Sequence, residues 1–298
     1  MSNRVSLQQR VDALQPKRWH ETVGGLGTSW WEYGPLHPGG DTIVAVHGFR
    51  GDHHGLEPFV AHWPDTHWII PDLPGFGESE DTPGARAHLD DFVSWLQSLV
   101  ERVRPATGRL IILGHSFGSI VVAATLAKGL DVDRAILVNP IAAPALAGPR
   151  GVLTRAAVAY YRIGSILPEQ LGRAWLSHPL IVRFMGAAMA KHPDRDVRRF
   201  VHDQHLRYFS RFVSRDGVLA AFRTSVSHDV SESARNIAVP LLLVAAERDD
   251  ITAVAEQERV AALTPRGKLV VIPRVGHLIH YETPAVAVEH MRAFLADA

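Results

Sequence analysis

The chain has 298 residues, an apolar fraction of 46%, and 31 basic residues against 31 acidic ones. This length suits one large α/β domain with an inserted segment, and zero formal net charge does not favour nucleic acid or a membrane as a general partner. The absence of cysteine excludes a disulfide framework, thiolate metal sites and a cysteine nucleophile.

The N-terminal segment gives no targeting signal. Residues 1 to 21 are polar and lack an apolar stretch followed by a small-residue cleavage site. No part of the chain reaches about 18 uninterrupted apolar residues, the length needed to cross a bilayer. We therefore expect a soluble, cytoplasmic protein without stable membrane association.

Short apolar runs alternate with helical patterns through the first half of the chain. Strands are predicted at residues 42 to 49, 67 to 77, 109 to 116 and 134 to 140, and helices at 85 to 103 and 117 to 130. This alternation is typical of a doubly wound, mainly parallel sheet with helices on both faces. We expect an α/β fold with about eight strands.

Residues 142 to 228 break this alternation, because they hold several helical patterns interrupted by prolines and no convincing strand. The α/β pattern then resumes with strands at 240 to 250 and 268 to 273, and helices from about 253 and 284. We interpret residues 1–141 and 229–298 as the core and residues 142–228 as an inserted helical cap.

The predicted cap is strongly basic, with twelve Arg and one Lys against one Glu and four Asp. Arginines on exposed helix faces that pair with carboxylates of the core would explain this charge. The alternative is that some of them attract an anionic substrate, as a basic cleft would.

The sequence Gly114-His115-Ser116-Phe117-Gly118 lies between a predicted buried strand and a predicted buried helix. A serine at such a sharp turn adopts a strained backbone, and the two glycines relieve crowding where strand and helix approach. The hydroxyl then lies at a helix N-terminus, where free N–H groups favour negative charge. This pattern predicts a serine nucleophile.

A serine hydroxyl needs a base, and the base needs an orienting carboxylate. A serine at such a strand-to-helix turn is called a nucleophile elbow, and the residues expected after it along the chain are first Asp or Glu and then His. Asp249 ends a predicted strand, with Asp250 beside it as a competitor, and His277 follows the last strand. Both positions are at carboxyl ends of parallel strands, where open α/β sheets gather their sites.

With these residues in place, the chain resembles the α/β-hydrolase fold enzymes that carry a helical cap after the sixth strand. The matching segments are VHGF at 46–49, DLPGFGES at 72–79, GHSFG at 114–118, AERDD at 246–250 and GHLIHYETP at 276–284. The resemblance extends over residues 40 to 297 and implies a catalytic triad of Ser116, His277 and Asp249. It also implies an oxyanion hole formed by the main-chain N–H groups of Phe49 and Phe117.

Several neighbouring residues have a structural interpretation. His47 is expected to shape the oxyanion loop, Asp72 to stabilise its own loop, and His280 to be structural. Asn139 stands where some relatives carry the acid, and an amide cannot carry that charge, which favours Asp249. Among the cap aromatics Trp175, Phe184, Tyr208 and Phe209, we expect some to roof the pocket.

We expect no metal and no organic cofactor. Adjacent His53 and His54 rarely converge on one ion, and no ligand cluster of suitable spacing accompanies them. The expected partner is a small acyl substrate. The oligomeric state stays open.

The reaction class follows less directly, because one fold serves many reactions. A serine at position 116 disfavours dehalogenase and epoxide hydrolase chemistry, in which the elbow carries aspartate, and favours hydrolysis of a carboxylic ester. A carbon–carbon bond hydrolase and a menaquinone-pathway lyase are alternatives. The segment HGFRGDHHG at 47–55 resembles the lyase, but the arginine usual after its serine is missing. A ligand receptor on a hydrolase scaffold is a third alternative.

Overall fold

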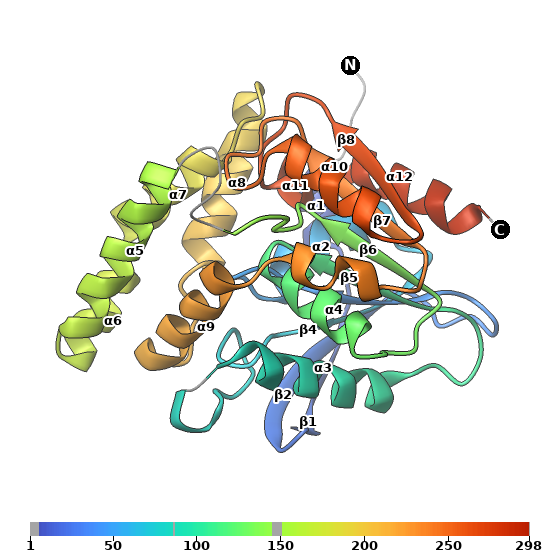
Figure 1. Ribbon diagram of the computed structural model, residues 1–298, viewed down its shortest axis with the longest axis horizontal. Coiled ribbons are helices and arrows are strands. Elements are labelled where there is room, and N and C mark those ends of the chain that lie inside the picture. Colours follow the sequence, from blue (N-terminus) through green and yellow to red (C-terminus); the bar gives the residue numbers. More distant parts are fainter. Residues whose placement is uncertain (1–5, 86, 145–150, 298) are drawn as a thin grey trace.

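In the computed structural model, residues 6–85, 87–144 and 151–297 are described. Eight strands form one sheet in the order β1-β2-β4-β3-β5-β6-β7-β8 (Figure 1). The strands are β1 Lys17–Val23, β2 Leu26–Tyr33, β3 Thr42–Val46, β4 His67–Pro71, β5 Leu110–His115, β6 Arg134–Val138, β7 Leu241–Ala246 and β8 Gly267–Ile272. Strand β2 is antiparallel to both of its neighbours, and the strands from β4 to β8 are parallel. The predicted α/β fold is confirmed.

The central strands are apolar along their whole length because both faces of the sheet are covered. In β3, Val44 and Val46 face the core formed with α3 and α4, whereas Ile43 and Ala45 face the core formed with α2 and α12. The helices outside the segment between β6 and β7 are α1 Leu7–Asp12, α2 Glu57–His62, α3 Leu89–Val103, α4 Phe117–Ala127, α10 Val254–Leu263, α11 Ile279–Glu282 and α12 Pro284–Ala296.

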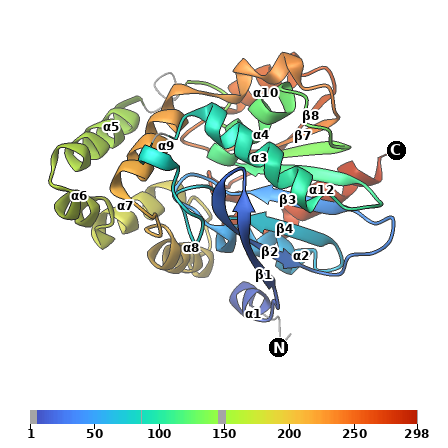
Figure 2. The same ribbon diagram turned by 90° about the horizontal axis from the view of Figure 1, so that it is seen from below.

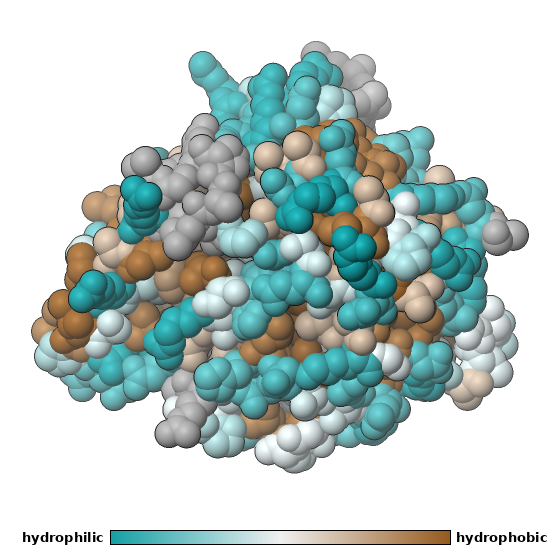
Figure 3. Space-filling model, viewed as in Figure 1, coloured by the Kyte–Doolittle hydropathy of each residue, from teal (hydrophilic) through white to brown (hydrophobic). Residues whose placement is uncertain are grey.

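Within the described part of the connection from β6 to β7 there are five α-helices, followed by two short 3-10 helices at Val230–Glu232 and Ala234–Asn236. The five α-helices are α5 Gly151–Ile166, α6 Glu169–Leu176, α7 Pro179–Met189, α8 Arg195–Tyr208 and α9 Arg215–Ser227. Figures 1 and 2 both place these α5–α9 helices to one side of the sheet. Figure 3 shows apolar side chains among polar ones over this part of the surface, and Ile166 and Leu180 are exposed. The boundaries of a separate cap domain stay a prediction.

Some predicted strands end earlier in the structure. Strand β3 ends at Val46 and strand β4 at Pro71, so the residues that follow each strand form loops at the carboxyl edge of the sheet. These loops carry several of the site residues. The antiparallel pair β1–β2, joined through Gly24 and Gly25, was not among the elements we placed from the sequence.

Among the described residues, no helix is both long enough and apolar enough to span a membrane.

Candidate active site

Ser116 lies between β5 and α4, where the chain turns sharply from strand to helix. Its backbone angles are φ 53° and ψ −118°. A residue with a side chain rarely adopts such a conformation, and it persists only where the surrounding structure holds it. Here Ser116 N–H donates to Val138 O at 3.1 Å, and Ser116 O accepts from Ser119 N–H at 2.9 Å.

The two glycines of the motif allow the strand and helix to approach. A Cβ atom at Gly114 would lie 2.6 Å from Gly118 O, and one at Gly118 would lie 2.3 Å from Val46 O. Real Cβ atoms do not come so close to backbone oxygens, so both positions require glycine. The sequence pattern is thus explained by backbone contact.

Ser116, His277 and Asp249 form a chain of hydrogen bonds across three loops at the carboxyl edge of the sheet. Ser116 Oγ lies 2.7 Å from His277 Nε2, and His277 Nδ1 lies 2.8 Å from Asp249 Oδ2. Asp249 follows β7 and His277 follows β8. All three residues predicted from the motifs therefore come together, in an arrangement that can pass a proton from the hydroxyl to the imidazole.

The Asp249 carboxylate is almost fully buried and is held by several donors. Its Oδ1 accepts from Ile251 N–H at 2.8 Å, and its Oδ2 also accepts from Asn139 Nδ2 at 3.1 Å. Burial alone would raise the pKa of Asp249, but His277 and these hydrogen bonds outweigh it and hold the pKa below its usual value. The adjacent Asp250 pairs instead with Lys191 Nζ at 2.7 Å.

Asn139 has a contact that the sequence reasoning missed. It follows β6 with a positive φ of 46°, donates to Asp249 and to Gly276 O, and accepts from Ile279 N–H. The residue at the alternative acid position thus orients the carboxylate instead of replacing it. Its position one residue after a parallel strand was the available signal.

Phe49 and Phe117 border the serine from two elements. Phe117 is the first residue of α4, where main-chain N–H groups have no partner within the helix. Phe49 lies in the turn closed by Gly51 N–H and Gly48 O at 3.0 Å. Their rings meet edge to face with centroids 6.4 Å apart, and both residues line the same cavity as Ser116.

This cavity has a volume of about 530 Å³ and lies between the sheet edge and the α5–α9 helices. Phe184, Tyr208 and Phe209 are among its lining residues, together with apolar side chains such as Ile141 and Phe222. Of the twelve arginines in residues 142–228, none lines the cavity within the part of the chain that is described. The arginine that does line it, Arg50, comes from the loop after β3.

Buried histidines surround the base. The His115 ring lies 4.1 Å from the ring of His280, measured between centroids, and burial lowers the pKa of His115 to about 3. Burial also lowers the pKa of His280 well below its usual value and that of His205 to about 4. These imidazoles are neutral at pH 7, so neither His115 nor His280 places a positive charge beside His277.

Two loop residues have the structural roles expected for them. His47 Nδ1 donates to Gly48 O at 2.8 Å, and its Nε2 accepts from Leu73 N–H at 2.9 Å, which joins the loops after β3 and β4. Asp72 is fully buried and accepts from the main-chain N–H groups of His53 and Glu78, both at 2.8 Å.

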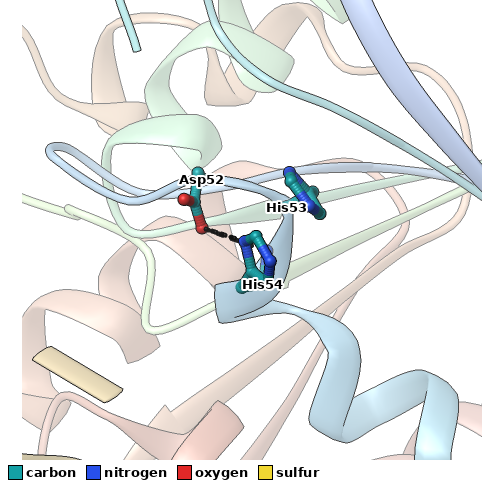
Figure 4. A group of neighbouring side chains, drawn as sticks. All are labelled: Asp52, His53 and His54. Atoms are coloured by element: carbon teal, nitrogen blue, oxygen red, sulfur yellow. Dashed lines mark hydrogen bonds and ion pairs between the residues drawn. The ribbon is translucent and has the colours of Figure 1, made fainter. Parts of the chain in front are cut away.

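Asp52, His53 and His54 form a cluster of possible metal ligands, although we expected no such cluster around the two histidines. One ligand atom of each lies within 4.8 Å of the others, and Figure 4 shows the bond from His54 to Asp52. The rings of His53 and His54 lie 3.9 Å apart, measured between centroids. Both Nδ1 atoms already have carboxylate partners, since His54 bonds Asp52 at 3.1 Å and His53 bonds Asp72 at 2.9 Å. His53 also stacks on Trp31. An ion would have to use the Nε2 atoms, and the expectation that no metal binds stays a prediction.

Comparison with known proteins relates the chain to a family. The model of the Alpha/beta hydrolase family matches residues 43–290. Pyrrolizixenacetamide deacetylase of Xenorhabdus hominickii is 25% identical over 261 residues, covering 86% of this chain and 91% of that protein. An uncharacterized protein of Salmonella typhimurium, YfhR, is 34% identical over 93 residues, so the match spans only 30% of its length and 28% of this chain.

Solved structures share the fold at low sequence identity. A thermophilic esterase from Thermogutta terrifontis superposes with a TM-score of 0.71 at 23% identity, covering 94% of this chain and 98% of that one. The enol-lactonase from Burkholderia xenovorans LB400 gives a TM-score of 0.75 at 18% identity, covering 94% of this chain and 100% of that one.

Proposed function

Because the chain belongs to the alpha/beta hydrolase family, we propose that it is a serine hydrolase that cleaves a carboxylic ester or a related acyl compound. The observation that carries the proposal is the hydrogen-bonded chain from Ser116 Oγ through His277 to Asp249, with links of 2.7 and 2.8 Å. The esterase titles of structural neighbours and the deacetylase name of one relative agree with it.

In this mechanism Ser116 Oγ attacks the carbonyl carbon while His277 Nε2 accepts the hydroxyl proton. Asp249 keeps the proton of His277 on Nδ1 and stabilises the imidazolium. The N–H groups of Phe49 and Phe117 would receive the oxyanion, and each such donor is typically worth about 2.7–4 kcal/mol of transition-state stabilisation. His277 then protonates the leaving group, and water releases the acyl group from Ser116 by the reverse sequence.

We further propose that residues 142–228 act as the cap and that the acyl group is apolar. The cavity wall around Ser116 includes Phe117, Ile141 and Phe222, and none of the cap arginines described in the structure lines it. An apolar acyl chain would be desolvated favourably against such side chains. The anionic alternative suggested by the basic cap has less support. This mechanism requires no metal or organic cofactor.

The test is reaction with a fluorophosphonate probe, followed by mass spectrometry to locate the modified residue, with Ser116→Ala as the control. A series of p-nitrophenyl esters from acetate to palmitate runs beside it. Labelling confined to Ser116, together with turnover that the variant lacks, would support the proposal and rank the acyl chain lengths.

A stable protein that is neither labelled nor active on any ester would contradict the proposal. Elimination of pyruvate from the menaquinone-pathway intermediate would then favour the lyase. Cleavage of a vinylogous diketone would favour the carbon–carbon bond hydrolase, and tight saturable binding without turnover would favour a receptor.

A further inference from the structure

Arg50 is a buried cation next to the proposed oxyanion residue Phe49. It lies in the turn after β3 and is only 1% exposed, among the largest fully buried side chains of the described residues. Its φ is 61°, in the left-handed region that arginine rarely adopts. A strained backbone that presents a buried charge requires strong contacts elsewhere.

Those contacts come from three of the α5–α9 helices. Arg50 Nη2 donates to Leu176 O at 2.6 Å, Nε donates to Phe209 O at 3.1 Å, and Nη1 donates to the Tyr161 hydroxyl at 3.2 Å. Tyr161 belongs to α5, Leu176 is the last residue of α6, and Phe209 caps the C-terminus of α8. One side chain of the core therefore holds three separate helices.

The charge is balanced by helix ends. Among the described residues, no carboxylate lies within ion-pair distance of Arg50. The carbonyl groups at the C-termini of α6 and α8 carry the negative ends of the helix dipoles, which stabilise a cation there. The Phe209 ring adds a cation–π contact, with its centroid 4.5 Å from the guanidinium carbon.

The same turn is linked to these helices through aromatic rings. Tyr161 stacks on Phe222 of α9 with centroids 3.8 Å apart, and the Phe49 ring lies 5.8 Å from Tyr161 and 5.9 Å from Phe222. Phe49 and Arg50 are the central residues of the turn from Gly48 to Gly51. A shift of α5 or α6 would therefore pull on the segment that carries the Phe49 N–H.

We propose that Arg50 is a positioning residue that fastens α5, α6 and α8 over the cavity and thereby holds the Phe49 N–H in place for catalysis. The proposal rests on the serine hydrolase function for its catalytic half. The claim that Arg50 holds α5, α6 and α8 in place does not depend on enzymatic activity. The guanidinium donates to four protein acceptors, the fourth being Ser210 Oγ at 3.4 Å from Nη2, so we assign it to holding the helices and not to binding a substrate anion.

Arg50→Gly is the sharpest variant, because glycine tolerates a φ of 61° while the whole buried side chain is removed, including every guanidinium contact. Arg50→Lys keeps the charge but loses the planar fork that reaches several acceptors. Arg223→Ala removes an exposed arginine from α9 and serves as the matched control. Each full-length variant is measured by hydrogen exchange at pH 7 and by steady-state hydrolysis of a p-nitrophenyl ester.

In Arg50→Gly we expect faster exchange confined to α5, α6 and α8, with the protection of β5 and β7 unchanged. We expect kcat to fall by about 10²-fold with a smaller change in KM, the loss typical of a displaced oxyanion donor. Arg50→Lys should lie between Arg50→Gly and the wild type in both measurements, and Arg223→Ala should match the wild type.

If hydrogen exchange in α5, α6 and α8 is the same in Arg50→Gly as in the wild type, Arg50 does not hold these helices in place, whatever the activity of the variant. Faster exchange with unchanged kcat would overturn the positioning role. If the wild-type protein hydrolyses no ester, the proposed function fails, while the exchange comparison still decides whether Arg50 fastens the helices. Should Arg50→Gly not fold, the comparison of Arg50→Lys with the wild type decides in the same way.

Discussion

His205 should make the protein less stable in mild acid. It lies on α8, with its ring 5.2 Å from Phe209 and 5.9 Å from Tyr281, and a Cβ atom at Gly186 would lie 2.6 Å from its Nδ1. Burial, together with smaller effects from His202 and Arg50, lowers the pKa of His205 from 6.5 to about 4. The variant His205→Leu removes this titrating group and keeps an apolar side chain.

The sign follows from proton binding. Below pH 6.5 the unfolded chain takes up a proton at this histidine, whereas the folded protein does not until the pH approaches 4, so acid favours unfolding. Each pH unit in this window costs about 1.4 kcal/mol, which gives about 2 kcal/mol between pH 7 and pH 5. Buried His115 and His280 act in the same direction, and Glu57 and Glu282, whose pKa values burial raises, act in the opposite one.

Urea unfolding at pH 7 and pH 5 measures this effect, because the difference between wild type and variant isolates one group from the others. His205→Leu should lose about 2 kcal/mol less of its free energy of unfolding than the wild type over this interval. His37→Gln removes an exposed histidine and should lose as much as the wild type. An equal loss in His205→Leu and the wild type would refute the reasoning.

Three further predictions concern the site. Gly118→Ala should destabilise the protein by about 3 kcal/mol, because its Cβ would lie 2.3 Å from Val46 O. The control is Gly55→Ala, whose Cβ would lie 3.6 Å from the nearest atom, the Tyr281 hydroxyl oxygen, and it should change the denaturation midpoint little. Asp249→Asn should lower kcat for ester hydrolysis by about 10⁴-fold. Adding Asn139→Asp should restore part of the lost activity, because Asn139 Nδ2 lies 3.1 Å from Asp249 Oδ2. If the double variant recovers no activity, a carboxylate at position 139 cannot replace the one at position 249. Dialysis against EDTA should leave ester turnover unchanged, and a loss reversed by Zn²⁺ would instead indicate a required ion, for which Asp52, His53 and His54 are candidate ligands.

The nucleophile motif was readable from the sequence because its requirements are local. Gly114, Ser116 and Gly118 lie within five residues, and the contacts that demand glycine follow from one strand turning into one helix. The positions of Asp249 and His277 could be predicted for a related reason, because the carboxyl ends of parallel strands meet at one edge of the sheet. The structure brings these residues within hydrogen-bonding distance.

Residues whose partners are distant in the chain could not be interpreted in this way. Arg50 bonds Leu176 and Phe209, more than a hundred positions later, and nothing in the local sequence predicts a charge balanced by helix ends. The net charge of residues 142–228 left two interpretations open, exposed arginines paired with carboxylates or an anionic substrate, because composition does not reveal which side chains face inward. From the sequence we concluded only that the Asn139 amide cannot replace the catalytic acid. Its hydrogen bond to Asp249 depends on packing between loops, which the sequence does not show.

The α5–α9 helices leave and rejoin the sheet at adjacent strands. Strands β6 and β7 pair directly, from Ala135 with Leu241 to Val138 with Val244, although the α5–α9 helices lie between them in the chain. The entropic cost of closing such a connection grows only with the logarithm of its length, about 0.6 kcal/mol per doubling. If these helices act as the proposed cap, insertions, deletions or exchange of them can therefore alter what enters the cavity while strands β6 and β7 keep their register. On the proposed cap function, evolution could change substrate choice without changing the stability of the sheet, and a replacement segment would need new acceptors for the buried Arg50 guanidinium.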